Sequence, residues 1–268
     1  MEAIKTIVRE HIDWRRQIFK LAKSDIIKTY SGAALGWIWA LVKPTITLLV
    51  FWFAFSVGLR QGGDVAGVPF VLWLMAGLLP WFYMSEMISQ GAGSIRRYKF
   101  LVTKMKFPIS TIPTFVAISK LSVHLLLMVI VTVIFMLTGH FPDIYFLQIP
   151  FYMLLMFAFF SQWALFSGML SSISKDFLNL VKSLTQAIFW LSGILWDVNS
   201  IANETLKTVL MFNPITFFAT GYRNVFVYKV WFWEEPMSLV YFGIMLIIMA
   251  LGAVWSYKKL IKEIPDVL

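Results

Sequence analysis

Long runs of apolar residues constrain this chain more than any other feature of its sequence. Segments such as 118–137 and 237–257 are about as long as the roughly 20 residues that a helix needs to cross a 30 Å hydrocarbon core. Hydrophobic residues make up 59% of the 268 residues and charged residues 14%, whereas a typical soluble domain has about 25% charged residues. A water-soluble fold of this size has no interior that could hold so much apolar surface. The sequence therefore predicts an all-α membrane protein.

The spacing of the apolar runs predicts six transmembrane helices. They cover residues 35–59, 70–90, 118–137, 149–173, 181–196 and 237–257. Most Lys and Arg residues fall on segments that this order places on one side of the membrane, and basic residues gather in cytoplasmic loops. We therefore expect a multi-pass protein of the plasma (inner) membrane with both termini in the cytoplasm. The net charge of +9 then reflects topology, and no nucleic-acid partner is expected.

Two segments outside the predicted spans have helical patterns of their own. Residues 1–34 carry apolar and basic side chains at helical spacing, which predicts an amphipathic helix in the headgroup region; a plain juxtamembrane tether is the alternative. Residues 206–228 contain two apolar stretches, separated by Asn213-Pro214 and each shorter than the roughly 17 residues of a spanning helix. We predict a pair of re-entrant or interfacial helices on the outer face, the second of which carries Tyr222 and Arg223.

The loop between the second and third predicted spans is the most basic part of the chain. Residues 94–108 contain no acidic residue. Among their basic and aromatic residues are Arg96, Arg97, Tyr98, Lys99, Phe100, Lys104 and Lys106. A second segment on the same side, residues 174–180, is predicted to be a tight turn that carries Lys175 and Asp176. Both segments lie on the cytoplasmic side in the predicted topology.

Several chemistries lack the residues that they need. The chain has no GxxxxGK[ST] loop to hold nucleotide phosphates and no HExxH motif, and its three histidines lie far apart in the sequence. It has no cysteine, which excludes disulfides and thiolate metal sites. Glu86 is the one acidic residue within the predicted spans, which disfavours an active site built from several ionisable groups. We expect a chain that is not an enzyme and that binds no metal or cofactor itself.

Two lysines and a group of aromatic residues lie where a substrate could pass. Lys43 falls within the first predicted span and Lys120 at the inner end of the third. Each either extends its ammonium group to the inner headgroups or contacts an anionic lipid phosphate that enters from the inner leaflet. The aromatic residues either face lipid or line a channel for sugar rings. The candidates for the substrate path are Lys28, Trp37, Trp39, Lys43, Phe189, Trp190 and Trp196.

The order of several short motifs along essentially the whole chain resembles a known transporter family. The motifs are Leu35-Gly36-Trp37-Ile38-Trp39-Ala40, Lys43-Pro44, Lys106-Phe107-Pro108, Ser174-Lys175-Asp176, Asn213-Pro214 and Gly221-Tyr222-Arg223. Together they resemble the permeases of polysaccharide-exporting ABC transporters. Within that family, the stretches 68–81 and 107–110 are similar to the permeases that translocate wall teichoic acid.

The resemblance implies a domain organisation and a set of partners. Residues 1–34 would form a gate helix, residues 35–268 the transmembrane domain, and segment 94–108 a coupling helix. The coupling helix would lie in a groove of a separate ATPase, which it would contact through Arg96, Arg97, Tyr98, Phe100, Lys104 and Lys106. Lys175 and Asp176 would make a second, smaller contact. Two copies of the chain would work with two ABC ATPase subunits, which bind the ATP and Mg²⁺. The complex would export a lipid-linked anionic polysaccharide, with wall teichoic acid as the first choice.

Other functions remain open at the level of sequence. A permease of the same fold could export O-antigen or capsule polysaccharide, or a drug or small lipid. A membrane-embedded glycosyl- or phosphotransferase is a further alternative from another class, which the lack of clustered carboxylates and histidines disfavours.

Overall fold

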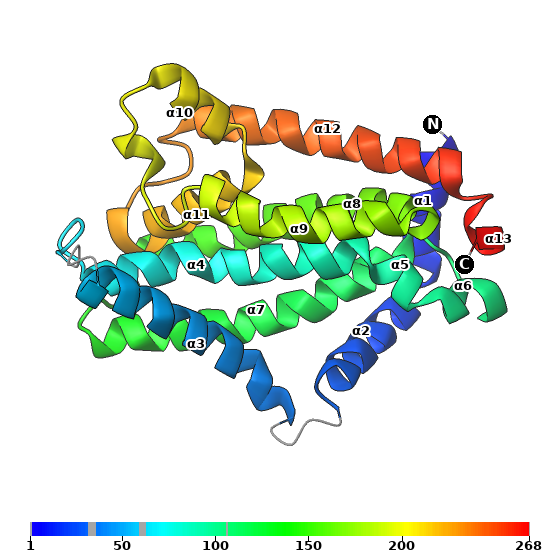
Figure 1. The fold of residues 1–268 in the computed structure, drawn as a ribbon, viewed down its shortest axis with the longest axis horizontal. Coiled ribbons are helices and arrows are strands. Elements are labelled where there is room, and N and C mark those ends of the chain that lie inside the picture. The colour runs from blue at the N-terminus through cyan, green and yellow to red at the C-terminus, as the bar shows by residue number, and fades with distance from the viewer. Residues whose placement is uncertain (1, 32–35, 59–62, 106, 268) are drawn as a thin grey trace.

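The computed structural model describes residues 2–31, 36–58, 63–105 and 107–267 (Figure 1). Within these ranges every regular element is a helix, apart from one isolated bridge between Val65 and Val68. The predicted all-α class is therefore confirmed.

The long helices lie side by side in one elongated bundle (Figure 1). They are α3 (Trp39–Trp52), α4 (Phe70–Glu86), α7 (Thr111–Leu137), α8 (Ile149–Ile173), α9 (Lys175–Leu191) and α12 (Pro236–Leu260). Short π-helical turns extend α3 to Gly58 and α4 to Gly91. The helices follow one another up and down the bundle, which is the arrangement that short loops between antiparallel neighbours produce.

Four helical segments are long and apolar enough to cross a membrane, among the residues that the structure describes. They are Phe70–Gly91, Thr111–Leu137, Ile144–Ile173 and Pro236–Leu260. These segments correspond to the second, third, fourth and sixth predicted spans. The first and fifth predicted spans are represented by the shorter α3 and α9, so the six-span topology stays a prediction.

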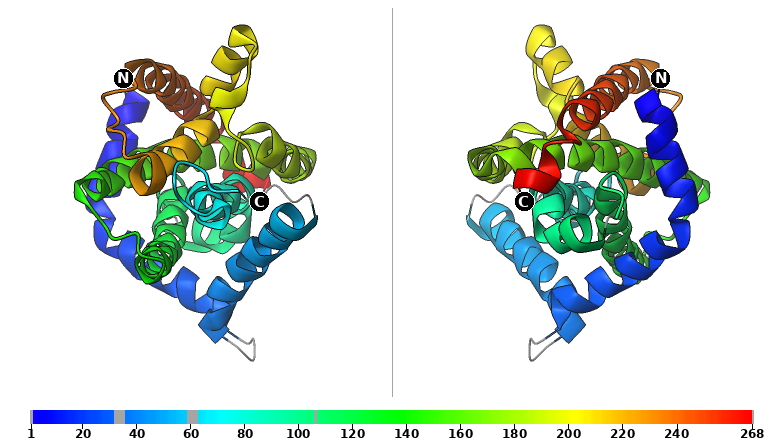
Figure 2. Two further views of the ribbon diagram at one scale, coloured as in Figure 1. Left: turned by 90° about the vertical axis from the view of Figure 1, so that its left-hand side faces the viewer. Right: turned by 90° about the vertical axis from the view of Figure 1, so that its right-hand side faces the viewer.

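The two ends of the bundle differ in what they carry. Both chain termini lie at one end, which we call the terminal end (Figure 1). That end carries α1 (Glu2–Asp13), α2 (Arg15–Tyr30), α5 (Ser94–Arg97), α6 (Lys99–Met105) and α13 (Ile264–Val267). The opposite end, which we call the loop end, carries α10 (Glu204–Met211) and α11 (Pro214–Arg223). Viewed along the bundle, α1 and α2 follow one side of it (Figure 2).

The interior of the bundle is built around α4. In the most apolar stretch of α4 and the turn that extends it, 78% is buried inside the protein. In the most apolar stretch of α12, 11% is buried. The core includes Leu72, Leu74 and Leu78 of α4, none of which is more than 1% exposed. A helix that is apolar on all sides can be surrounded by other helices or can face lipid. In this fold α4 is surrounded by other helices, whereas most of the surface of α12 is available to face lipid.

The amphipathic segment is two helices and not one. The predicted continuous helix over residues 1–34 breaks at Trp14, where α1 ends and α2 begins. The indole of Trp14 packs edge-on against Phe107, with ring centroids 4.9 Å apart. This contact anchors the break to the segment that follows α6. No residue of α1 is buried, while Ile18 and Ala22 of α2 join the core.

The predicted single helix over residues 94–108 is also wrong. It consists of α5 and α6, which meet at Tyr98. The backbone leaves the helical conformation there, with φ −107° and ψ 27°, and the Tyr98 side chain is buried against Phe115 in an edge-on contact with ring centroids 4.8 Å apart. The buried tyrosine turns the chain inward in the middle of its most basic segment.

Three further boundaries differ from expectation. The predicted tight turn over 174–180 is the first part of α9, because the Ser174 hydroxyl caps the helix by accepting a hydrogen bond from the Phe177 N–H. The fifth predicted span, 181–196, therefore begins earlier and ends at Leu191. The predicted re-entrant pair is unequal: no residue of α10 is buried, whereas most residues of α11 are.

Candidate functional site

At the terminal end, a buried carboxylate ties α2 to the basic segment. Asp25 of α2 is 2% exposed and accepts a hydrogen bond from the Tyr98 hydroxyl. Its carboxylate also forms an ion pair with Arg97, whose Nη2 lies 3.1 Å from Oδ1. Burial raises the pKa of the Tyr98 hydroxyl, and the hydrogen bond to Asp25 adds to that rise. Arg97 and Tyr98 therefore tie the basic segment to the amphipathic helix, and Tyr98 is buried while the Arg97 side chain stays 37% exposed.

The remaining members of the basic segment divide into inward and outward residues. Arg96 is half-buried, and its guanidinium donates to the carbonyls of Ser171 and Ser172 at the end of α8. Phe100 and Lys104 of α6 are exposed, as is Lys28 of α2, whose Nζ lies 5.8 Å from the centroid of the Phe100 ring. The candidate Lys106 lies outside the described residues. Within the basic segment, the outward surface is thus formed by α6 together with the exposed part of Arg97.

Within the bundle, α4 and α7 are joined by an ion pair that the sequence does not predict. Lys120 of α7 is 6% exposed, and its Nζ lies 3.0 Å from the Glu86 carboxylate of α4. Glu86 also accepts a hydrogen bond from Gln90, one turn further along. Lys120 therefore points into the protein, and the alternative in which it extends freely to the headgroups is wrong. A buried lysine needs such a partner because an unpaired charge in a low-dielectric interior is costly.

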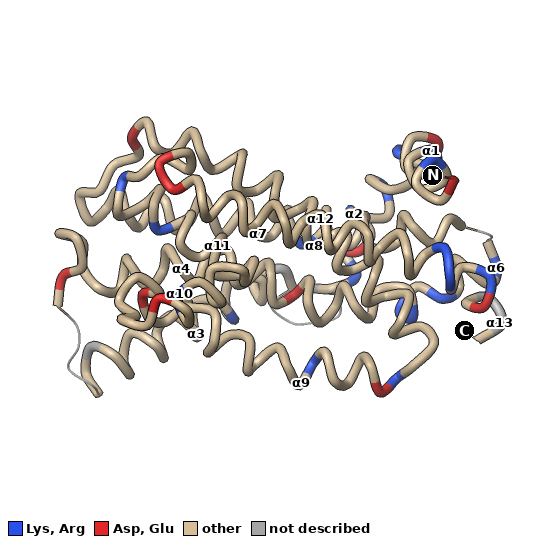
Figure 3. Tube along the Cα trace, turned by 90° about the horizontal axis from the view of Figure 1, so that it is seen from above, with Lys and Arg blue, Asp and Glu red and all other residues tan. Residues whose placement is uncertain are grey.

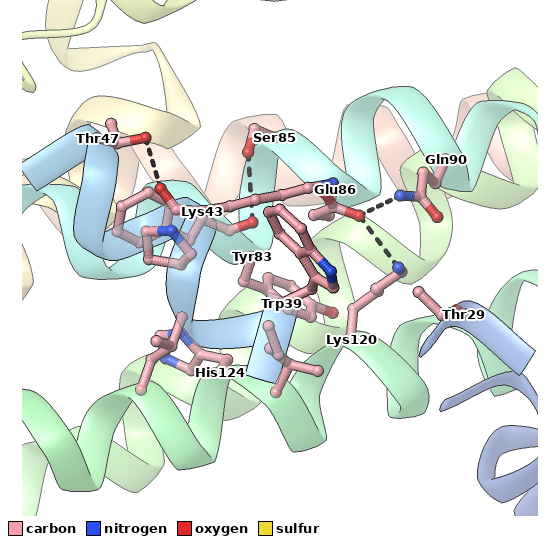
Figure 4. Close-up of a pocket in the computed structure, with 15 residues that line it drawn as sticks. Thr29, Trp39, Lys43, Thr47, Tyr83, Ser85, Glu86, Gln90, Lys120 and His124 are labelled. Carbon is pink, nitrogen blue, oxygen red and sulfur yellow. Dashed lines mark hydrogen bonds and ion pairs between the residues drawn. The ribbon is translucent and has the colours of Figure 1, made fainter. Parts of the chain in front are cut away.

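This ion pair forms part of a cavity of about 470 Å³, which we call the lateral cavity. Its lining comes from the end of α2, the first half of α3, the second half of α4 and the middle of α7 (Figure 4). Trp39 and Lys43 contribute the α3 wall, and both side chains are exposed. The first candidate tryptophan, Trp37, lies in the turn before α3, and its side chain is outside the described part of the structure. The lateral cavity thus brings two candidate path residues together with Lys120.

The other aromatic candidates lie on α9 or just after it, and their environments differ. Phe189 is buried between Phe51 of α3 and Trp81 of α4, with ring centroids 5.4 Å and 5.2 Å away. Trp190 is 51% exposed. Trp196 follows the helix and donates its indole N–H to the Trp190 carbonyl at 3.0 Å. Phe189 is therefore a packing residue, and only Trp190 presents a large free aromatic surface.

Helix α9 has an exposed face that is unusually polar for one of the long helices of the bundle. Its exposed polar residues, spaced at helical intervals, are Asn179, Lys182, Ser183 and Gln186. Lys175 and Asp176 are exposed at its start. Polar side chains directed at hydrocarbon are costly. This face is therefore suited to a second protein surface or to water.

At the loop end, Arg223 holds three segments together. Its guanidinium donates to the carbonyls of Gly193, at 2.8 Å, and Ile194, and lies 3.5 Å from the centroid of the Trp73 ring. Arg223 is 2% exposed. A Cβ atom added to Gly77 of α4 would lie only 2.6 Å from its Nη2. Gly77 therefore leaves the space that this arginine occupies.

The other outer candidates also have structural contacts. Asn213 caps α11 by accepting a hydrogen bond from the Ile215 N–H, and its amide donates to the Ser192 hydroxyl at 2.7 Å. Pro214 occupies the first helical position, where no N–H donor is needed. The Tyr222 hydroxyl lies 2.7 Å from His124 Nε2. These contacts fix α11 against the bundle.

Several residues that organise these sites were not predicted. Asp25 and Glu10 are acidic residues within a basic amphipathic segment, and no feature of the sequence distinguishes them from Glu2 and Asp13, which are exposed. Glu10 accepts hydrogen bonds from Ser110 and Tyr257. Gly77 gave no signal, because a glycine in a spanning helix has many uses. No group of three or more His, Cys, Asp or Glu that could hold a metal ion is present among the described residues.

The sequence matches the family model of ABC-2 type transporters over residues 16–227. The chain therefore belongs to the ABC-2 type transporter family. It is a multi-pass membrane permease subunit without an ATPase domain of its own, in agreement with its lack of a phosphate-binding loop.

Curated relatives extend the likeness over most of the chain. The O-antigen export system permease protein RfbA of Myxococcus xanthus is 26% identical over 82% of this chain and 84% of its own length. A protein of the same name from Klebsiella pneumoniae is 22% identical over 91% of this chain and 93% of its own length. The polysialic acid transport protein KpsM of Escherichia coli is 24% identical over 71% of this chain and 73% of its own length.

Proposed function

We propose that this chain is the permease subunit of an ABC exporter that moves a lipid-linked polysaccharide out of the cytoplasm. The observation that carries the proposal is the likeness, over 82% and 91% of the chain, to two permeases named for O-antigen export. The energy comes from the hydrolysis of ATP by two separate ABC ATPase subunits, which bind the ATP and Mg²⁺. The exposed polar face of α9 supports the proposal, because a hydrophilic polymer needs a protein-lined path across the hydrocarbon.

The terminal end is the cytoplasmic end in this proposal, and both termini are cytoplasmic. Basic residues gather around α5, α6 and the end of α12 (Figure 3), which is the distribution expected on the cytoplasmic side. The ATPase contacts are the outward residues Lys99, Phe100 and Lys104 of α6, with Lys175 and Asp176 of α9 as a second contact. Arg96, Arg97 and Tyr98 act by holding α5 and α2 in position beneath that surface.

The path itself lies between two copies of the chain. One helical bundle buries its own core and leaves α3 and the polar face of α9 uncovered, so a second copy facing these helices would complete a channel. Trp190 would then present its free ring to the sugar units. An apolar, weakly oriented surface of this kind lets a polymer slide, because no single contact holds it tightly.

The named relatives favour O-antigen or capsule polysaccharide over wall teichoic acid as the class of polymer. Wall teichoic acid is the second candidate, and it rests on the stretches 68–81 and 107–110 alone. A drug or small lipid has no support from these relatives. The membrane-embedded transferase is set aside, since the family is one of transporter subunits.

The test is export by a reconstituted complex. The full chain with its ATPase subunits, placed in proteoliposomes, is supplied with lipid-linked O-antigen on the ATPase side, and polymer that reaches the other side is measured. We expect transfer that requires ATP, and no ATP hydrolysis by the chain alone. Trp190→Ala should slow transfer by about two- to tenfold, the effect of losing an aromatic contact, while ATP hydrolysis persists.

The matched control is Trp255→Ala on α12, because Trp255 is as exposed as Trp190, at 52% against 51%. Trp255 lies on α12, the least buried of the four long apolar segments, so its removal should leave transfer unchanged. Absence of ATP-dependent transfer for O-antigen and for teichoic acid alike would contradict the proposed function.

A further inference from the structure

One side chain joins two ion pairs of the bundle. In the inner ion pair, Lys120 Nζ lies 3.0 Å from the Glu86 carboxylate; in the terminal ion pair, Arg97 Nη2 lies 3.1 Å from Asp25 Oδ1. Between the pairs, Gln90 donates its amide N–H to Glu86 and accepts a hydrogen bond from Arg97 at 2.9 Å. Figure 4 shows Glu86 between Gln90 and Lys120. These five residues form an unbroken series of polar contacts from α7 and α4 to α5 and α2, which we call the relay.

The charges along the relay alternate in sign, and the neutral amide of Gln90 lies at its centre. A carboxamide has a donor end and an acceptor end. The donor end of Gln90 meets the carboxylate of Glu86, and its acceptor end meets the guanidinium of Arg97. A reversed amide would place N–H against N–H and oxygen against oxygen, so the hydrogen-bond network fixes its orientation. The position of Gln90 therefore depends on both ion pairs at once.

The two ends of the relay are buried, whereas its middle is partly exposed. The side chains of Lys120 and Asp25 are 6% and 2% exposed, while those of Glu86 and Arg97 are 39% and 37% exposed. Removing the partner of a buried charge is strongly destabilising. Each buried charge therefore holds its more exposed partner in place. A displacement of Arg97 is more easily passed on to Gln90 and Glu86 than absorbed by separating an ion pair.

A π-helical turn places Gln90 at the end of α4. Residues Met87–Gly91 continue the helix in this wider form, which is rare and frequently occurs at functional sites. Gly91 lies so close to α8 that an added Cβ atom would be 2.9 Å from the Cβ of Ala164. The turn is thus seated directly on α8. The backbone of Gln90 is fixed to the core of the bundle, and its side chain reaches the basic segment.

We propose that Gln90 is a positioning residue for energy coupling, because the relay makes the basic segment move as one body with α4 and α7. This inference rests on the proposed function, in which α6 contacts the ATPase. Arg97 ends α5, and α6 begins at Lys99, two residues later. A force that the ATPase exerts on α6 therefore reaches Arg97 first and passes through Gln90 to Glu86.

Packing between the basic segment and α7 is the simpler alternative. The Tyr98 ring, for example, packs edge-on against Phe115 of α7. If packing alone held the segment, an apolar side chain of similar size could replace Gln90, which is only half-buried. Gln90→Met tests this directly, since it keeps the size of the side chain and removes both hydrogen bonds.

Two further variants test the order of charges in the relay. Gln90→Glu keeps an acceptor for Arg97 but sets two carboxylates one helical turn apart, where they repel each other. The exchange variant combines it with Glu86→Gln. There Lys120 donates to the amide oxygen at position 86, the amide N–H donates to the carboxylate at position 90, and Arg97 pairs with that carboxylate, so every contact again joins a donor to an acceptor. Gln17→Met, the same substitution at an exposed site of α2, is the control.

The first measurement is the amount of polymer transferred per ATP hydrolysed by the reconstituted complex. Gln90→Met and Gln90→Glu should each lower this ratio about three- to tenfold, the usual size of a change in coupling between distant sites, while ATP hydrolysis persists. The exchange variant should restore most of the lost transfer, and Gln17→Met should match the wild type. Equal ratios in wild type and Gln90→Met, or an exchange variant no better than Gln90→Glu, would overturn the proposal. Thermal unfolding in detergent shows whether each variant is folded, and the comparison of Gln90→Glu with the exchange variant decides if Gln90→Met is not.

The second measurement needs no polymer. Because the chain has no cysteine, spin labels can be attached at Met105→Cys on α6 and Ser122→Cys on α7, both of which are exposed sites. Pulsed electron paramagnetic resonance then gives the distance between the labels in the complex with its ATPase subunits, with labelled chain diluted into unlabelled chain. In the wild-type background this distance should be the same with and without ATP. In Gln90→Met it should shift or broaden when ATP binds.

The two measurements separate the relay from the proposed function. A distance that responds to ATP in the same way in both backgrounds would overturn the relay, and polymer transfer by the wild type would then leave the proposed function standing. A distance that responds only in Gln90→Met, without polymer transfer by the wild type, would support the relay and contradict the proposed function.

Discussion

Helices α11 and α3 are both apolar, and the fold treats them in opposite ways. In α11 the buried residues include Phe217, Phe218 and Tyr222, and its cap and its last residue are both hydrogen-bonded to the segment after α9. In α3 only Ala40 and Pro44 are buried. The shorter helix is therefore part of the rigid core, and the longer one is attached along one edge.

The difference shows that apolar length and structural role are separate properties in this protein. Helix α11 is fixed by specific polar contacts that a lipid could not replace. Helix α3 presents most of its surface outward, and its other face borders the lateral cavity. A helix held this way can change its position at low cost, since few packed contacts are lost when it moves. The part that can move lies beside the lateral cavity.

The largest expected effect contrasts one phenylalanine from each helix. Phe218→Ala in α11 should lower the free energy of unfolding by about 3–5 kcal/mol, the usual cost of removing a buried aromatic ring, because Phe218 is 0% exposed and packs against Phe160 and Phe242. Phe53→Ala, just after α3, should cost about 0.5 kcal/mol or less, because Phe53 is 59% exposed. Thermal unfolding in detergent measures both. Equal losses would show that the two regions are packed alike.

A smaller effect tests the contact between α11 and α4. Gly77→Ala places a methyl group against the Arg223 guanidinium, and the overpacking should destabilise the fold by about 1–3 kcal/mol. Gly243→Ala on α12 is the matched control, because a Cβ atom there has no neighbour within 4 Å; alanine should be neutral or stabilising in that helix. A Gly77→Ala protein as stable as the wild type would mean that Arg223 moves without loss, and that the clamp is not rigid.

The smallest effect is a pH dependence at the loop end. Burial raises the pKa of Glu235, which precedes α12 and accepts a hydrogen bond from Asn224 at 3.2 Å. Because its folded-state pKa lies above the ordinary value, folding favours the protonated form, and stability falls as the pH rises from the ordinary value through the folded-state value. Glu235→Gln should flatten the stability profile over the pH range that begins near the ordinary pKa of a glutamate and extends above it.

The measurement is a series of thermal unfolding curves across that range, with Glu263→Gln as a control at the exposed terminal end. A Glu235→Gln profile as steep as that of the wild type would assign the pH dependence to other groups. This result would weaken the view that the loop end is tightly packed, since desolvation of Glu235 depends on that packing.

The sequence predicts a structural feature correctly where neighbouring residues determine that feature, and it fails where residues far apart in the chain determine it. The bounds of α8 agree with the fourth predicted span, because Ser174 ends the helix and a run of apolar residues defines it. The basic segment was predicted as one exposed helix, and its outward half, α6, agrees with that. Its inward half does not, because Tyr98 finds a partner in Asp25, 73 positions earlier in the chain. A contact between distant residues leaves no periodicity in either segment.

The sequence by itself determined that this chain lies in a membrane, where most of its long apolar helices lie and that it has no phosphate-binding loop. Those properties depend on apolar content, spacing and motif, which are local along the chain. The tertiary structure decided which apolar helix is central, that Lys120 meets Glu86 and that Arg223 is enclosed by Gly77 and Trp73. In a membrane the hydrophobic effect does not distinguish a lipid-facing helix from a buried one. The choice is made by close packing and by hydrogen bonds between distant residues, and only the folded chain shows them.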